Sequence, residues 1–196
     1  MVGRKISNQG CLKLAFNLLD GSCGLEFRTK TNETFNQELT MTVLAKEIIT
    51  NAEVGRMLSD REVSRFKPAE IREAIQSLVS EGKDALAIAL GDAGLSLYPE
   101  SEDILAITGL LSLMRQEWAQ AVDLIESLRA IQGENTPPFT YVMLVRALRC
   151  NLEPVRALAV VNEGLKKYPD QIELAAESLI LQDFSNSVLV KETTAH

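Results

Sequence analysis

Residues suited to catalysis or metal binding are scarce in this chain. Its single histidine is His196, which disfavours Ser–His or Cys–His nucleophilic catalysis and a histidine-based metal site. The three cysteines, Cys11, Cys23 and Cys150, form no C-x-x-C pair. Such an odd, unpaired set favours neither a disulfide framework nor a zinc site. The sequence therefore predicts no metal and no cofactor.

Carboxylates are the remaining candidates for chemistry. Glu100, Glu102 and Asp103 stand where a helix is expected to begin, and the positive end of the helix dipole explains acidic residues there. Segment 91–94 (GDAG) has the small residues that suit close helix packing. No phosphate-binding loop, dinucleotide fingerprint or nucleophile elbow occurs. We therefore expect a protein that is not an enzyme. A small-molecule enzyme is the alternative, identified by a turnover that is lost on mutating Asp92 or Asp103.

Charge and hydropathy narrow the class of protein further. The 196 residues include 20 basic and 27 acidic side chains, a net charge of −7. A binder of nucleic acid needs a basic surface, so none is expected. Hydrophobic residues make up 46%, enough for a folded core. No apolar run approaches the roughly 20 residues that cross a bilayer, and Lys13 interrupts the apolar stretch near the N-terminus, so we expect a cytoplasmic protein without membrane insertion.

Three regions differ in their pattern. Residues 1–37 contain loose alternation around a glycine turn, which predicts a flexible N-terminal arm or a short hairpin. Residues 38–182 have helical periodicity, and residues 183–196 form a tail without a periodic signal. Ser59 followed by Glu62 is typical of a capping box. Whether Met1 or Met41 is the natural start stays open.

Prolines, glycines and capping residues divide the periodic region into helices. The expected segments are Glu38–Leu58, Pro68 to Gly82, Lys83–Leu97, one from Glu102, one from Glu117, one from Pro138, one from Pro154 to Pro169, and Asp170–Gln182.

Part of this region repeats. Segment 95–99 (LSLYP) recurs as segment 165–169 (LKKYP), 70 residues later. Ala87 and Ala157 each precede the closing proline by 12 residues. This spacing is about twice the roughly 34-residue period of one family of helix-pair repeats.

The chain resembles the tetratricopeptide repeat (TPR) family, with units at Pro68–Ser101, Glu102–Asn135 and Pro138–Gln171. The family's signature positions carry Ile71, Ala74, Leu78, Ala87, Pro99, Gly109, Trp118, Ala121, Tyr141, Leu144, Leu148, Ala157 and Pro169. Gly133 replaces one closing proline, and Gly91 stands where a large residue is usual, which predicts loose packing there.

The resemblance implies an all-α fold, a right-handed superhelical stack of three TPR-like helix pairs with capping helices at both ends. Glu38–Leu58 would cover one end and Asp170–Gln182 the other. On the second capping helix, Ile172, Ala175 and Leu179 are expected to face the last repeat. A generic helical bundle is the alternative.

TPR proteins bind ligands along the first helix of each pair, which implies a peptide-binding groove in this chain. The matching residues are Arg72, Gln76, Asp103, Ala106, Leu110, Phe139, Val142, Arg146 and Arg149, with Ala69, Val79 and Leu113 beside them. Apolar residues in the middle and arginines on a solvated wall suit a peptide with apolar anchors and acidic flanks. Alternatively, several of these side chains pack against the end helices.

The resemblance is compatible with several biological roles. Asp103 and Leu110 occupy positions where heat-shock adaptors carry a polar or basic clamp, so such an adaptor is disfavoured. Secretion chaperones for type III translocators are similar in size and in the order of their helices. A structural scaffold subunit of a pilus, a flagellum or another assembly is the alternative. The partner and the pathway stay open, as does the oligomeric state, for which a homodimer is one possibility.

Overall fold

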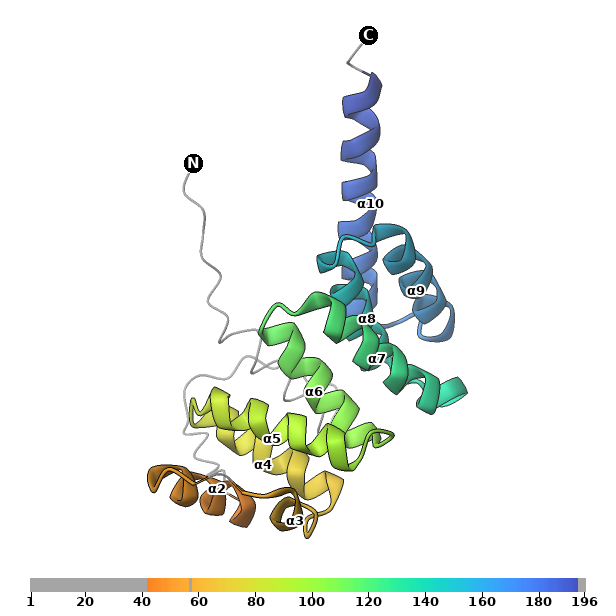
Figure 1. Ribbon diagram of the computed structural model, residues 1–196. Coiled ribbons are helices and arrows are strands. Elements are labelled where there is room, and N and C mark those ends of the chain that lie inside the picture. The colour runs from red at the N-terminus through yellow and green to blue at the C-terminus, as the bar shows by residue number, and fades with distance from the viewer. Residues whose placement is uncertain (1–41, 57, 194–196) are drawn as a thin grey trace, which may run out of the picture.

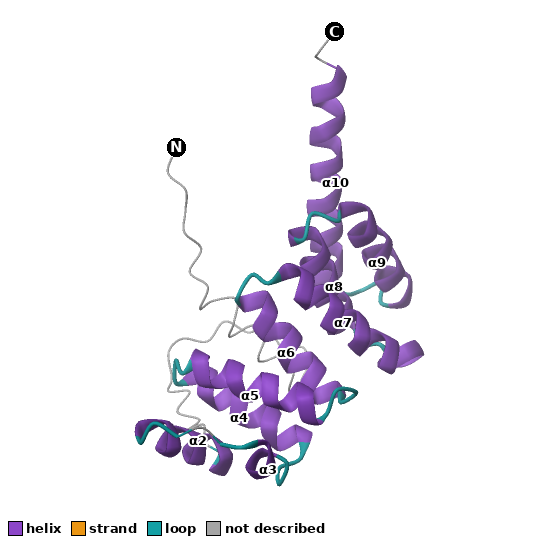
Figure 2. Cartoon of the chain, viewed as in Figure 1, coloured by secondary structure: helices purple, strands orange, loops and turns teal. Residues whose placement is uncertain are grey.

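In the computed structural model, residues 42–56 and 58–193 are described. Within these ranges all regular secondary structure is helical, and loops connect the helices (Figure 2). The helices are α2 (Val43–Glu53), α3 (Asp60–Val63), α4 (Pro68–Ser80), α5 (Asp84–Leu97), α6 (Glu102–Met114), α7 (Trp118–Gln132), a 3-10 turn (Gly133–Asn135), α8 (Pro138–Cys150), α9 (Pro154–Lys167) and α10 (Ile172–Thr193). The all-α prediction is confirmed. The predictions for residues 1–37 lie outside the described residues.

The helices form a right-handed superhelical stack of three TPR-like pairs, α4–α5, α6–α7 and α8–α9, with α2–α3 at one end and α10 at the other (Figure 1). The first helices make a row in which each contacts the next: α2, α4, α6, α8 and α10. We call this the first-helix row. Each second helix packs against its own first helix and against the first helix of the following pair. A linear array of this kind buries its core by stacking neighbours.

The 70-residue repeat in the sequence is also a repeat of contacts. A Cβ on Gly94 would lie 3.2 Å from Ile104 Cδ1, and a Cβ on Gly164 would lie 3.0 Å from Leu174 Cδ1. Each glycine therefore lets the next helix of the first-helix row approach closely, α6 at Gly94 and α10 at Gly164. Because a larger side chain would have to displace these neighbours, the two positions accept little but glycine.

The tyrosine of the repeated segment has one structural role in both copies. Tyr98 donates a hydrogen bond to the carbonyl of Phe66 at 3.0 Å, and Tyr168 donates one to the carbonyl of Thr136 at 2.8 Å. Both acceptors lie two residues before the proline that opens the pair. The end of the first pair and that of the third are thereby tied to their own beginnings, which satisfies a carbonyl in each connecting segment.

Gly91 does not produce the loose packing expected from the sequence. A Cβ at this position would lie 3.1 Å from Thr108 Cγ2 and 3.3 Å from Leu111 Cδ1. Thr108 and Leu111 of α6 occupy the space that a larger side chain would need, and the cavity beside them measures only about 10 Å³. The prediction was wrong because side chains of the neighbouring helix fill the volume that Gly91 leaves.

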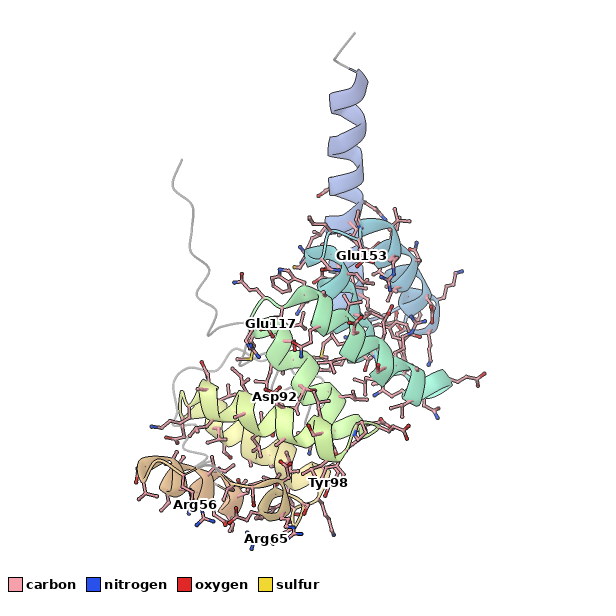
Figure 3. The ribbon with its side chains drawn as sticks, viewed as in Figure 1. Arg56, Arg65, Asp92, Tyr98, Glu117 and Glu153 are labelled. Carbon is pink, nitrogen blue, oxygen red and sulfur yellow. The ribbon has the colours of Figure 1, made fainter. Side chains whose placement is uncertain are left out.

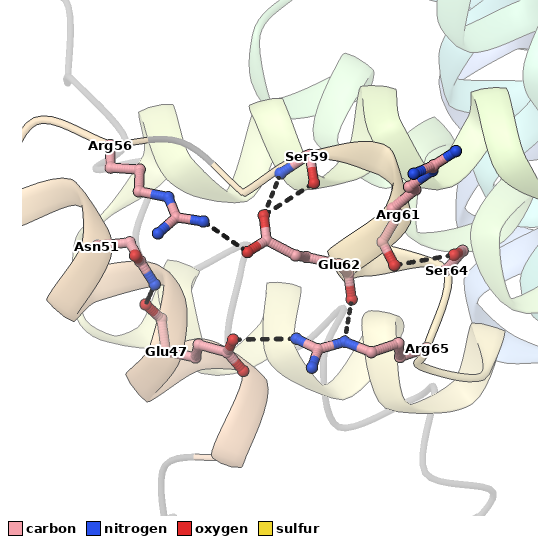
Figure 4. Close-up of polar contacts among 8 residues, drawn as sticks. All are labelled: Glu47, Asn51, Arg56, Ser59, Arg61, Glu62, Ser64 and Arg65. Atoms are coloured by element: carbon pink, nitrogen blue, oxygen red, sulfur yellow. Dashed lines mark hydrogen bonds and ion pairs between the residues drawn. The ribbon is translucent and has the colours of Figure 1, made fainter.

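The first capping element is shorter than expected. Helix α2 ends at Glu53, and after a loop the one-turn helix α3 begins behind Ser59. Glu62 accepts hydrogen bonds from the backbone N and the hydroxyl of Ser59, both at 2.8 Å (Figure 4). The same carboxylate pairs with Arg56 at 2.7 Å, while Arg65 pairs with Glu47 at 3.1 Å. The predicted glutamate thus caps α3, and the serine hydroxyl donates to it.

Helix α10 differs from the prediction in length and in the face that it buries. It continues to Thr193, into the C-terminal tail in which the sequence shows no periodic signal. Leu174 and Leu181 are buried, whereas the residues expected to cover the last repeat are exposed: Ile172 by 79%, Leu179 by 63%, and Ala175 likewise. The buried stripe also includes Glu177 and Ser178. The helix therefore packs with a partly polar face against α8 and α9.

No helix among the described residues is long and apolar enough to cross a membrane.

Candidate functional site

The predicted site residues lie on three consecutive members of the first-helix row: α4, α6 and α8. Proline stands in the first turn of α4 and of α8, where its missing N–H costs nothing. Helix α6 begins with two acidic residues at its positive end. Within each helix the site residues recur at spacings of three and four, so they share one face.

Arg72 and Asp103 come together between α4 and α6. Arg72 Nε lies 3.4 Å from Asp103 Oδ1, and the two side chains are 23% and 38% exposed. The charges therefore cancel in large part, and this end of the row offers little net charge to a ligand. Gln76, on the next turn of α4, is half-buried.

Two of the apolar residues expected in the middle of the groove belong to the hydrophobic core. Leu110 is 6% exposed and Val142 is 4% exposed, so neither offers the ligand contact expected from the sequence. Phe139, Ala106 and Leu113 are half-buried. Apolar contact with a ligand would therefore come from these three side chains, because Leu110 and Val142 are too buried to reach a ligand.

Arg146 and Arg149 do not lie on an open, solvated wall. Both face Glu177 of α10: Arg146 Nε donates to Glu177 Oε1 at 2.6 Å, and Arg149 Nε lies 3.4 Å from Oε2. The side chain of Glu177 is only 5% exposed, whereas those of Arg146 and Arg149 are 44% and 36% exposed. The pair thus lies beside the end helix, as one alternative interpretation of the sequence allowed.

Sequence reasoning missed Glu177. It lies three residues after Leu174 and four before Leu181, both buried. A carboxylate on such a stripe indicates a buried ion pair, because an unpaired charge there would be costly. That signal was present in the sequence, but it required knowing which face of α10 is buried.

The carboxylates considered for catalysis are not gathered into one site. Asp92 lies exposed on α5, while Glu102 is exposed at the start of α6 and Asp103 pairs with Arg72. Figure 3 shows Asp92 apart from the other carboxylates that it labels, Glu117 and Glu153. No group of histidine, cysteine and carboxylate side chains that could hold a metal occurs among the described residues.

A cavity of about 40 Å³ lies between α2, α3 and α5, lined mainly by apolar side chains such as Ile48, Leu58 and Leu90. It is far smaller than the several hundred Å³ of ordinary ligand pockets.

Comparisons with known proteins support the fold. No protein-family model and no curated protein matches the sequence significantly. Among solved structures, a MamA RS-1 ArsTM double mutant superimposes with a TM-score of 0.57 at 13% identity, covering 78% of this chain and 88% of that one. A MamA point mutant gives 0.55 at 15% identity, covering 77% and 91%. Residues 41 to the end of MamA from Desulfovibrio magneticus RS-1 give 0.51 at 12% identity, covering 83% and 99%. At these identities the likeness concerns the TPR-like fold.

Proposed function

We propose that the chain is a non-enzymatic protein-interaction module that holds a peptide segment of a partner along α4, α6 and α8. The observation that carries this proposal is the mixed character of the first-helix row. Phe139, Ala106 and Leu113 are half-buried, and Arg146 lies two turns from Phe139 on the same face of α8. Side chains of this kind combine apolar contact with charge-assisted hydrogen bonds, as peptide-binding surfaces require.

The biological role that fits this proposal is a cytoplasmic secretion-type chaperone or adaptor. It rests on the order of the helices: an N-terminal capping element, three pairs and a final helix. Such a protein would shield an apolar segment of its partner until the partner is handed on.

A structural scaffold subunit is the second candidate. Large apolar side chains are exposed at both capping elements. Val43 of α2 and Val54 just after that helix are each 76% exposed, and on α10 Ile172 is 79% and Leu179 63% exposed. Apolar residues left open at the ends of a stack favour contact with further subunits of an assembly.

Site-specific photo-crosslinking in the native host tests the proposal. The photoreactive residue p-benzoylphenylalanine replaces Ala106 or Phe139 on the first-helix row, or, as a matched control, the exposed Ala119 or Ala130 of α7. We expect a partner protein to be captured from the first two positions only. Capture solely from the two control positions would contradict the proposal. A secreted apolar protein identified by mass spectrometry would support the chaperone, and a subunit of an assembly would support the scaffold.

A further inference from the structure

The Arg146–Arg149 pair carries more positive charge than its surroundings cancel. Each other arginine in an ion pair of the described residues has at least one carboxylate to itself: Arg56 with Glu62, Arg65 with Glu47, Arg72 with Asp103, Arg115 with Glu117, Arg129 with Glu163, and Arg156 with both Glu126 and Glu153. Arg146 and Arg149 share the single carboxylate of Glu177. One positive charge therefore has no carboxylate partner among the described residues, in a chain whose net charge is −7.

The two guanidinium groups approach Glu177 through their Nε atoms. Their terminal nitrogens make no hydrogen bond with any described residue, although each guanidinium has four N–H donors at that end. The side chains of Arg146 and Arg149 are 44% and 36% exposed. The free donors are therefore accessible, one turn apart on α8, and suited to the planar geometry of a carboxylate.

Glu177 also leaves part of this cluster unsatisfied. Its Oε2 and the Nε of Arg149 are buried and have no hydrogen-bond partner among the described residues, although 3.4 Å separates them. Glu177 thus orients the arginines from one side without using up their capacity to bind an anion.

We propose that Arg146 and Arg149 bind one aspartate or glutamate side chain of the partner peptide, and that Glu177 limits the affinity by cancelling one of the two positive charges. This inference rests on the proposed function, because it assigns the chemistry of a residue in the bound peptide. It also makes α10 part of the binding site as well as a cap.

The spacing on α8 predicts a register for the peptide. Phe139 and Arg146 are seven residues apart on one helix, a distance of roughly 10 Å at 1.5 Å per residue. Whatever the direction of the rest of the peptide along the row, the extended part that joins these two contacts must cover that distance, which takes about three residues at about 3.3 Å each. We therefore expect the acidic residue to lie about three positions from an apolar residue that contacts Phe139.

Selection from a random dodecapeptide library displayed on phage tests this inference with the whole chain as bait. Display blocks the peptide's C-terminus, so any acidic preference reports side chains. Three baits are compared: the wild type, the double variant Arg146→Gln/Arg149→Gln, and the double variant Arg129→Gln/Arg156→Gln. The last removes the same charge from two ion-paired arginines on the second helices α7 and α9. Melting curves confirm that each bait is folded.

We expect peptides selected on the wild type and on the α7–α9 control to share an apolar residue and an acidic residue about three positions apart. The Arg146→Gln/Arg149→Gln bait should keep the apolar preference and lose the acidic one, and a wild-type peptide should bind it at least about tenfold more weakly. An apolar motif without an arginine-dependent acidic position would overturn this inference and leave the proposed function intact. If the folded wild type selects no peptide, both fail.

Glu177→Gln provides a second test, which distinguishes anion binding by the two arginines from a purely structural role in docking α10. Glutamine can still accept a hydrogen bond from Arg146 Nε but no longer cancels its charge. The selected peptide should bind this variant more tightly, on the order of three- to tenfold, and the gain should shrink at high salt. If the only effect is a lower melting temperature with unchanged affinity, the arginine pair merely docks α10 and the inference fails.

Discussion

At the scale of single residues, small side chains set how closely the paired helices approach. Ala121 on α7 and Ala157 on α9 are fully buried, as the repeat register predicts. On the facing helix of the second pair, a Cβ on Gly109 would lie 3.0 Å from Ile125 Cγ1. The space between α6 and α7 is therefore filled, and any added volume must displace a neighbour.

Enlarging one of these residues should be costly. Ala121→Leu should lower the free energy of unfolding by about 1–3 kcal/mol through overpacking. Ala130→Leu, an exposed position on the same helix, is the matched control and should change it by less than about 0.5 kcal/mol. Denaturant unfolding of both variants makes the measurement. Equal stability of the two would mean that the register of the second pair is different.

The stability of the first capping element should depend on pH through the carboxylate of Glu62. Hydrogen bonds from Ser59, first from its backbone N–H and then from its hydroxyl, together with Arg56 and Arg65, lower the pKa of Glu62 below its usual 4.5. A lowered pKa stabilises the fold above the unfolded-state value, and this contribution is lost as pH falls through the folded-state value. Glu62→Gln should therefore lower the melting temperature at pH 7, and the difference from wild type should shrink as pH falls through the lowered folded-state pKa.

The exposed Glu53 is a suitable control for this experiment, since it makes no hydrogen bond or ion pair with a described residue. Glu53→Gln should leave the melting temperature nearly unchanged across the whole acidic range. A difference for Glu62→Gln that stays constant as pH falls would contradict the proposed linkage, because a contribution from the ionised carboxylate must decrease on protonation.

Site positions could be predicted from the sequence more readily than their accessibility. The spacing of Arg146 and Arg149 shows that they share a face of a first helix. It does not show that Glu177, 31 residues after Arg146, meets both of them. Leu110 and Val142 likewise match ligand-facing positions of the family yet are buried. Exposure depends on the exact approach of neighbouring helices, which periodicity within one helix does not report.

At the scale of elements, the boundaries marked by proline and glycine agree with the structure from Pro68 to Lys167. These residues act locally, since proline favours a helix start and the repeated segment is closed by a tyrosine and a proline. The capping elements were harder to predict. Apolar residues lie on two sides of α10, with Leu174 and Leu181 on one and Leu179 and Ile180 on the other. Periodicity alone could not decide which side faces α8 and α9.

Truncating single side chains should distinguish the two sides of α10. Leu174 is fully buried, and its Cδ1 packs against Gly164 of α9. Leu174→Ala should therefore lower the free energy of unfolding by about 2–5 kcal/mol. Leu179→Ala removes the same atoms from a side chain that is 63% exposed and should cost under about 0.5 kcal/mol. If denaturant unfolding shows Leu179→Ala to be the more destabilising of the two, α10 buries the face expected from the sequence and not the face described above.

At the scale of the whole molecule, stacking places α4, α6 and α8 side by side although their first residues are 34 to 36 positions apart. A ligand lying along the row would contact three pairs at once, so its affinity depends on the stack remaining intact. The second helices α5, α7 and α9 would be in contact with the core but not with the ligand. The proposed function therefore predicts that the partner contacts the first helices and leaves the second helices free.

Hydrogen–deuterium exchange with and without the crosslinked partner, purified and added in excess, tests that prediction directly. We expect the bound partner to slow amide exchange in α4, α6, α8 and the first turns of α10, with little change in the exposed turns of α5, α7 and α9. Protection confined to α5, α7 and α9, with none on the first-helix row, would contradict it.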